Sequence, residues 1–153
     1  MSTQVGYTQG DTLDPTYKEV KSGTTGHVEA VMVRYDPTVT SFEKLLHVYW
    51  NRHEVGGKFD PTLKDRQGND KGSQYRSGIY FFTEDQKEAA LASKREAKEK
   101  LKPWQKIYVE VKPATTFYVA EENHQQYLSE KGGRRGNAQN PGKGVCDAIR
   151  CYG

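Results

Sequence analysis

Residues 28–36, VEAVMVRYD, place apolar side chains on both faces of a possible β-strand. The two faces hold three such residues each: Val31, Val33 and Tyr35 on one, and Val28, Ala30 and Met32 on the other. A strand that is apolar on both faces is typical of the interior of a sheet that is covered on both sides. The segment therefore predicts an internal strand, so the rest of the chain must supply its neighbours and the helices that cover them.

Two amphipathic segments can form those helices. Residues 40–53 carry apolar and aromatic side chains at helical spacing, at Phe42, Leu45, Leu46, Tyr49, Trp50 and His53. Thr40 and Glu43 form a capping-box pattern at the start of this segment. Residues 83–101 predict a second helix, with Thr83 as its N-cap and interspersed charges that are typical of a solvated face.

Shorter segments supply the remaining elements. Strands are expected at three further places, residues 3–7, 78–82 and 105–113. In the last of these, Ile107, Val109 and Val111 alternate with residues that face the other side. Residues 120–128 predict a short helix. This order of elements predicts an α+β fold with a mixed or antiparallel sheet covered by helices.

The length of 153 residues and the distribution of charge bound the class of protein. We expect one domain over residues 1–130 and a flexible, Gly-rich tail over residues 131–153. The tail holds five basic residues and one acidic residue, so with a net charge of +3 the body of the chain is close to neutral. No apolar run reaches the ~20 residues of a membrane helix, and the N-terminus shows no secretory signal. We therefore expect a cytoplasmic or organelle-matrix protein that does not bind membranes.

Three polar stretches and two cysteines are candidates for chemistry. Residues 66–78, RQGNDKGSQYRSG, combine polar side chains with three glycines that allow close approach to a ligand, unless this is a plain solvated loop. Glu29 opens an otherwise apolar strand, either as a functional acid or as a charge at a strand end, and Tyr17 follows a turn in DPTY. Cys146 and Cys151 lie in the tail, and two thiols lack the other ligands of structural zinc, so no metal site is expected.

Together these stretches resemble the peptide-methionine (S)-S-oxide reductase family (methionine sulfoxide reductase A). The similar segments follow the family's order: STQVGYT, DPTYKEVKSGTTGHVEAV, YDP, RQGNDKGSQYRSGIY and AEENHQQYL. They span residues 2–128, and GKGVC in the tail resembles the family's recycling segment. The resemblance implies reduction of the S epimer of methionine sulfoxide, free or in proteins, by a monomer without a bound cofactor. The fold expected for the chain is a two-layer α/β sandwich with a ferredoxin-like core.

The resemblance implies roles for four residues at the sulfoxide. Glu29 matches a buried acid that protonates the sulfoxide oxygen, a role that requires desolvation to keep the carboxyl protonated. Tyr17 and Tyr75 match phenols that hydrogen-bond the same oxygen. Asp70 matches a polar residue of the substrate pocket.

The two thiols match the recycling part of the family's reaction. Cys146 matches the resolving cysteine, which condenses with a cysteine sulfenic acid to a disulfide. Cys151 would be the second recycling thiol. Thioredoxin, or dithiothreitol in the test tube, is the implied external reductant.

The family's nucleophile lies in a Gly-Cys-Phe-Trp-Gly motif that is absent from this sequence. The match begins at residue 2, inside a segment that resembles the middle of a strand. We therefore expect that the family's first strand and helix are missing here. We expect no turnover of sulfoxide by these 153 residues alone.

Two other functions stay open on the sequence. The residues Glu29, Tyr17 and Tyr75 are also compatible with a module that binds oxidised methionine peptides without reducing them. A nucleic-acid role would rest on the basic tail, but few aromatic residues interleave with its charges, so we expect no nucleic acid partner. Histidines 47, 53 and 124 are interpreted as structural helix residues.

Overall fold

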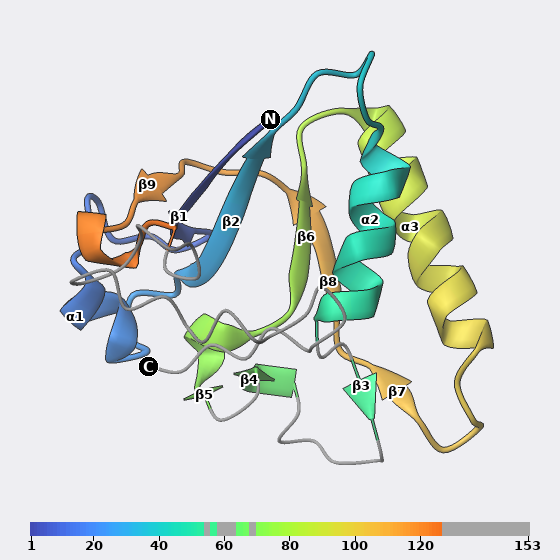
Figure 1. The fold of residues 1–153 in the computed structure, drawn as a ribbon. Helices are drawn as coiled ribbons and strands as arrows, with labels where there is room; N and C mark the ends of the chain where they lie inside the picture. Colours follow the sequence, from blue (N-terminus) through green and yellow to red (C-terminus); the bar gives the residue numbers. More distant parts are fainter. Residues whose placement is uncertain (54–55, 58–63, 68–69, 127–153) are drawn as a thin grey trace, which may run out of the picture. The chain divides into compact units, whose positions relative to one another are not determined.

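The computed structural model of the chain describes residues 1–53, 56–57, 64–67 and 70–126. These residues form strands, α-helices and short 3₁₀ turns, which confirms the expected α+β class (Figure 1). They divide into two compact units, one of residues 1–35 and 115–126, and the other of the described residues from 36 to 114. The expected tail lies outside the described residues, and the single domain over residues 1–130 stays a prediction.

The first unit is built on an antiparallel sheet with the strand order β2-β1-β9 (Figure 1). Its strands are β1 (Ser2–Thr8), β2 (Val28–Arg34) and β9 (Tyr118–Val119). Tyr7 on the central strand lies opposite Glu29 on one side and Tyr118 on the other. Because opposite residues in antiparallel strands point to the same face, these three side chains form a row across the sheet.

The expectation that residues 28–36 form an internal strand is wrong within the described residues. There β2 pairs with β1 alone and forms one edge of the sheet. This edge position leaves Val31 59% exposed, although the apolar pattern predicted cover on both faces. The physical reason is that β-branched residues favour an extended backbone at edges as well as in the interior, so their presence does not fix the number of neighbouring strands.

A short helix, α1 (Tyr17–Lys21), follows the loop after β1. Thr16 and Glu19 form a capping box at its start: the hydroxyl oxygen of Thr16 accepts a hydrogen bond from the backbone N–H of Glu19, and the carboxylate of Glu19 accepts one from the backbone N–H of Thr16. The buried residue of the helix, Val20, belongs to a core cluster with Tyr7 and Ala120. The cap and this buried contact together set where α1 begins and which face it turns to the sheet.

After β9 the chain returns along β1. In the described part of the segment that was expected to form a helix, residues 120–126, Glu122–His124 form a single helical turn, η3, and residues 127–128 lie outside the described residues. The side-chain amide of Gln125 accepts a hydrogen bond from the backbone N–H of Val5 at 3.0 Å and donates one to its carbonyl oxygen at 2.9 Å. Gln125 thus pairs with β1 as a neighbouring strand would, and this contact competes with continuation of the helix.

The second unit packs two helices against a parallel pair of strands. Its main elements are α2 (Phe42–Arg52), α3 (Glu84–Glu99), β6 (Gly78–Phe81) and β8 (Glu110–Pro113). Figure 1 shows α2 and α3 side by side. Leu46, Ile79, Ala90 and Val109 form the buried core of this unit. Leu46 and Val109 come from the apolar positions predicted for the first helix and the last strand, which are confirmed.

One helix begins at the N-cap residue predicted from the sequence, and the other begins one residue later than predicted. Thr83 caps α3 as predicted, because its hydroxyl oxygen accepts a hydrogen bond from the backbone N–H of Gln86 at 3.2 Å. The cap of α2 is Ser41 rather than Thr40, and its hydroxyl oxygen accepts from the backbone N–H of Lys44 at 3.4 Å. Both residues are good N-caps, and the helix begins after the second of the two.

Small pairs of strands complete the second unit. They are β3 (Gly56–Gly57) with β7 (Lys106–Ile107), and β4 (Arg66–Gln67) with β5 (Asp70–Lys71). The strand expected over residues 105–113 is therefore divided into β7 and β8. A single 3₁₀ turn, η2 (Ser73–Tyr75), leads from β5 to β6. This turn carries one of the residues expected at the sulfoxide.

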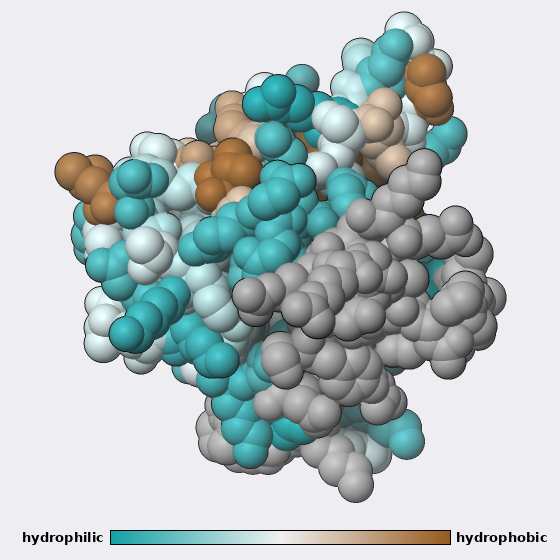
Figure 2. Space-filling model, turned by 60° about the vertical axis from the view of Figure 1, so that its left-hand side comes forward, coloured by the Kyte–Doolittle hydropathy of each residue, from teal (hydrophilic) through white to brown (hydrophobic). Residues whose placement is uncertain are grey.

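On the face that Figure 2 displays, the apolar side chains of the described residues lie apart from one another. Hydrophilic side chains dominate there, and apolar ones form separate spots. Exposed apolar residues of the described part include Leu13, Phe82 and Trp104. Within the described residues, no helix combines the length and apolar character needed to cross a membrane.

Candidate functional site

The first unit brings two of the predicted site residues to one buried phenol. Tyr7, 2% exposed, lies at the centre of the sheet with Glu29 directly opposite it on β2. Tyr17, at the first position of α1, packs against the cluster that contains Tyr7. Glu29 and Tyr17 are 12 positions apart in the chain and meet here because the β1–β2 register and the cap of α1 both place them beside Tyr7.

Tyr7 is held by a carboxylate far away in the sequence. Its hydroxyl donates a hydrogen bond to Oε2 of Glu121 at 2.7 Å, while Oε1 of Glu121 accepts one from the backbone N–H of Tyr17 at 2.8 Å. Burial, the bond to Glu121 and the nearby charges of Glu121 and Glu29 raise the pKa of Tyr7. Burial opposes ionisation of Glu121, but its bonds from Tyr17 and Tyr7 lower its pKa overall. At neutral pH the pair is therefore a protonated phenol donating to an ionised carboxylate.

The expectation of a buried acid at Glu29 is wrong in one respect. The residue lies in the row with Tyr7 as the register requires, but it is exposed. The reason is that β2 is an edge strand in the described residues, so water reaches its side chains from the open side. A carboxyl in this place is accessible to a ligand as well as to water.

Tyr17 presents an accessible ring between polar neighbours. Its ring centroid lies 4.4 Å from that of His124 in η3, and Nζ of Lys21 lies 5.6 Å from the ring centroid. Within the described residues its hydroxyl has no hydrogen-bond partner. The phenol is half-buried and positioned by its ring contacts, so its O–H is available to a ligand.

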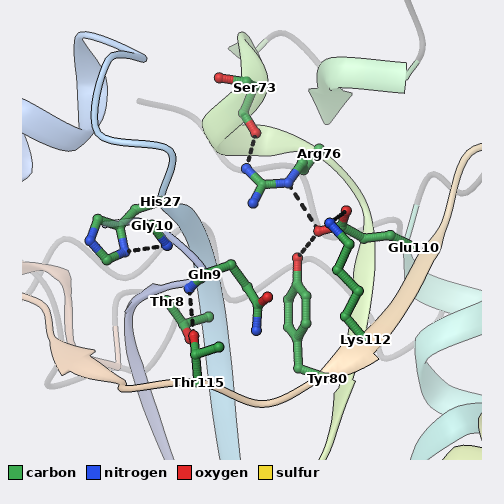
Figure 3. A network of polar contacts seen from close by, with 10 residues as sticks. All are labelled: Thr8, Gln9, Gly10, His27, Ser73, Arg76, Tyr80, Glu110, Lys112 and Thr115. Atoms are coloured by element: carbon green, nitrogen blue, oxygen red, sulfur yellow. Dashed lines mark hydrogen bonds and ion pairs between the residues drawn. The ribbon is translucent and has the colours of Figure 1, made fainter. Parts of the chain in front are cut away.

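A buried histidine orders the loop that leads to Tyr17. His27, 1% exposed, accepts a hydrogen bond from the backbone N–H of Gly10 on Nδ1 and donates from Nε2 to the carbonyl oxygen of Thr12, as Figure 3 shows for the Gly10 contact. A Cβ at Gly10 would collide with the backbone and ring of His27. The loop therefore depends on a glycine for close approach and on a neutral imidazole with both nitrogens bonded.

The second unit carries the other two predicted site residues. Asp70 lies on β5, opposite Gln67 of β4, and Tyr75 ends the η2 turn five residues later. Both side chains are half-buried. Gly72 between them has φ +137°, which favours glycine, and its N–H donates to the carbonyl oxygen of Asp65 at 2.9 Å. The Gly-rich pattern of the sequence thus predicted a real turn that holds Asp70 and Tyr75 on one short segment.

Cys146 and Cys151 lie outside the described residues, so their predicted recycling roles stay predictions. Sequence reasoning missed Tyr7 and Glu121 as parts of the site. Tyr7 stands in VGYT, within a segment that resembled the family, but the pattern alone did not distinguish it from a core aromatic. No local signal links it to Glu121, 114 positions later.

Comparison with known proteins gives one consistent result. The family model "Peptide methionine sulfoxide reductase" matches residues 1–144. A protein of that name from Lactuca sativa is 52% identical over 151 residues, covering 99% of this chain and 55% of the relative. Peptide methionine sulfoxide reductase A1 of Arabidopsis thaliana is 51% identical over 151 residues, covering 99% of this chain and 70% of the relative. The chain therefore spans between about half and three quarters of the length of such relatives.

Solved structures give the same result. Reduced Mxr1 from Saccharomyces cerevisiae superimposes with a TM-score of 0.69 at 32% identity, covering 82% of this chain and 68% of that chain. Methionine sulfoxide reductase A of Corynebacterium diphtheriae superimposes with a TM-score of 0.67 at 39% identity, covering 83% and 62%. The similarity thus extends from sequence to fold over most of the described residues.

Proposed function

The chain belongs to the peptide methionine sulfoxide reductase family, and from this premise we propose that it serves the reduction of methionine-S-sulfoxide, free or in proteins, to methionine. The observation that carries the proposal is the meeting of Glu29 and Tyr17 at Tyr7 in the first unit. An acid and a phenol that both lie beside Tyr7 are groups that an S=O oxygen needs, because oxygen leaves sulfur only after it has been protonated.

The proposed chemistry begins with attack on sulfur. A cysteine thiolate forms a bond to the sulfoxide sulfur while Glu29 transfers its proton to the oxygen, with Tyr17 and Tyr75 as hydrogen-bond donors. The S–O bond then breaks as the protonated oxygen is transferred to the cysteine sulfur, and the S–S bond formed in the attack breaks as methionine is released, which leaves a cysteine sulfenic acid. Two electrons thus move from the thiolate sulfur to the sulfoxide sulfur.

The position of Glu29 sets a condition on this step. Glu29 is exposed in the first unit, so a bound substrate would have to cover its carboxyl before desolvation could favour the protonated form. A methionine side chain and its flanking peptide would provide this cover. Asp70 would contribute a polar contact to the same substrate.

Recycling would use the two thiols of the tail. Cys146 attacks the sulfenic acid and releases water, which leaves a disulfide. Cys151 exchanges into that disulfide, and two thiols of thioredoxin, or dithiothreitol, reduce the result. We propose a monomer of the cytoplasm or an organelle matrix that needs no other cofactor. A relative in Arabidopsis thaliana is named as chloroplastic.

We propose that the cysteine that attacks the sulfoxide sulfur in the first step is neither Cys146 nor Cys151. Cys146 and Cys151 both match recycling positions, and both lie outside the described residues. We therefore expect the 153 residues to show no turnover of a methionine-S-sulfoxide peptide with dithiothreitol. Fusion to an N-terminal segment that supplies the family's Gly-Cys-Phe-Trp-Gly motif should restore turnover.

The fused protein then tests the site itself. Glu29→Gln and Tyr17→Phe should lower kcat by roughly a hundredfold or more, because each removes a proton donor to the leaving oxygen. Glu88→Gln, on the exposed side of α3, is the matched control. Turnover by the unfused chain would overturn the expectation that its nucleophile is missing, and full activity of Glu29→Gln would overturn the proposed role of Glu29. Calorimetric binding of the peptide by the unfused chain without turnover, lost in Glu29→Ala, would support the non-catalytic binder instead.

A further inference from the structure

The turn that carries Tyr75 has little structure of its own. Ser73–Tyr75 form a single 3₁₀ turn, in which the N–H of Tyr75 donates to the carbonyl oxygen of Gly72 at 2.9 Å. A turn of three residues makes too few internal hydrogen bonds to fix a side chain. Contacts from neighbouring elements must therefore hold it.

The next residue, Arg76, supplies such a contact. Its Nη1 donates to the carbonyl oxygen of Ser73 at 2.9 Å, across the turn, and its Nε donates to Oε1 of Glu110 on β8 at 3.0 Å (Figure 3). The side chains of Arg76 and Glu110 are 16% and 21% exposed. The planar guanidinium therefore joins the start of the turn to a strand of the core, and a lysine cannot make both bonds.

Glu110 is itself fixed from two sides. The hydroxyl of Tyr80 on β6 donates to Oε1 at 2.7 Å, and Nζ of Lys112 lies 2.6 Å from Oε2 (Figure 3). Gly78 lies opposite Glu110 in the parallel pair, and a Cβ there would collide with the Tyr80 hydroxyl. Gly78 thus leaves the space through which Tyr80 reaches Glu110.

These partners make the largely buried ion pair favourable. Burial opposes the charge of Glu110, but hydrogen bonds from Lys112, Tyr80 and Arg76 lower its pKa overall. A buried carboxylate stabilises structure only when its lone pairs are satisfied, and here three donors meet it. The network therefore joins an ionised Glu110 to three donors at neutral pH, and through Arg76 it ends at the carbonyl oxygen of Ser73.

We propose that Arg76 and Glu110 are a positioning pair for Tyr75: by clamping the η2 turn to β6 and β8, they hold the Tyr75 phenol in the place from which it donates to the substrate oxygen. The part of the inference that rests on the proposed function is that the Tyr75 phenol donates a hydrogen bond to the substrate oxygen. The clamp itself is independent of that function, so the two are tested separately.

The test uses the full chain with ¹³C-labelled tyrosine, and Tyr75→Phe assigns the Tyr75 ring signals by NMR. Arg76→Lys and Glu110→Gln should move the Tyr75 ring shifts toward random-coil values, while the methyl signals of Ile79 and Val109 report an intact core. The kcat/KM of the fused protein for a methionine-S-sulfoxide peptide should fall on the order of tenfold in both variants.

Lys87→Gln is the matched control, because it breaks an exposed ion pair with Glu84 in the same unit. It should change neither measurement. If Arg76→Lys or Glu110→Gln loses its core signals, Tyr80→Phe tests the positioning pair instead, because it removes one hydrogen-bond donor to Glu110. It should shift the Tyr75 signals in the same direction but by a smaller amount. Unchanged Tyr75 signals in folded variants would overturn the positioning pair. If the Tyr75 signals shift in the folded variants but Glu29→Gln and Tyr17→Phe leave turnover by the fused protein unchanged, the pair stands and the proposed function fails.

Discussion

Replacement of Tyr7 by phenylalanine isolates the hydrogen bond at the centre of the first unit. The phenol donates to an ionised carboxylate at 2.7 Å, and such a bond contributes about 1.5–3 kcal/mol. Glu121 is exposed and regains water when the phenol is gone, so we expect the lower end, about 1.5 kcal/mol. For a chain of this length the midpoint of thermal unfolding should fall by roughly 3–6 °C.

The effect should depend on pH in a defined direction. The pKa of Glu121 is lowered in the folded chain, so its contribution is present above its ordinary value of 4.5 and is lost as the pH falls. The pKa of Tyr7 is raised from its ordinary value of 10.0, so its contribution is present below that value and is lost only at higher pH. The difference between wild type and Tyr7→Phe should thus be full near pH 7 and shrink below roughly pH 4.

Urea unfolding followed by circular dichroism at pH 7 and at pH 3.5 measures both differences. Tyr35→Phe is the matched control, because the Tyr35 hydroxyl has no hydrogen-bond partner among the described residues. The reasoning is refuted if the two variants are equally stable at pH 7. It is also refuted if the Tyr7→Phe difference persists undiminished at the lower pH.

Three further substitutions test the fold. Thr83→Ala removes the hydroxyl that caps the N–H of Gln86 and should lower the free energy of unfolding by about 1 kcal/mol; an unchanged urea midpoint would contradict the cap. Gly10→Ala places a Cβ against His27 and should lower the thermal midpoint, with a loss of protection from hydrogen exchange in the loop; unaltered stability would show that the loop has room. Leu46→Ala empties a core position that is 4% exposed and should cost about 2–5 kcal/mol, so a loss under 1 kcal/mol would refute its central place.

The elements that the sequence predicted well are those with local causes. The apolar period of α2 and the cap of α3 involve residues within four positions of each other, and both are confirmed. The residues at which helices begin and end were less predictable. Thr40 and Ser41 are equally good caps, and the helix expected over residues 120–128 gave way to the pairing of Gln125 with Val5. That pairing spans 120 positions and leaves no local trace in the sequence.

The candidate site shows the same difference between local and long-range causes. The resemblance to the family implied roles for Glu29 and Tyr17, and the register and core of the first unit bring both to Tyr7. Their supports were not predictable, because Glu121 binds Tyr7 and the N–H of Tyr17 across 114 and 104 positions. A motif thus identifies groups that do chemistry, whereas the groups that aim them are found only when the chain has folded.

The exposure of Glu29 shows why this distinction matters for the mechanism. A carboxyl that is permanently buried keeps its proton whether or not substrate is present, and the fold bears the cost of its desolvation. Glu29 is exposed on an edge strand, so under the proposed function the cost of desolvating its carboxyl would fall on substrate binding instead. Tyr7 opposite it remains protonated at neutral pH, because burial and the carboxylate of Glu121 hold its proton. The proposed site would therefore combine a fixed phenol with an accessible carboxyl that only a bound substrate covers.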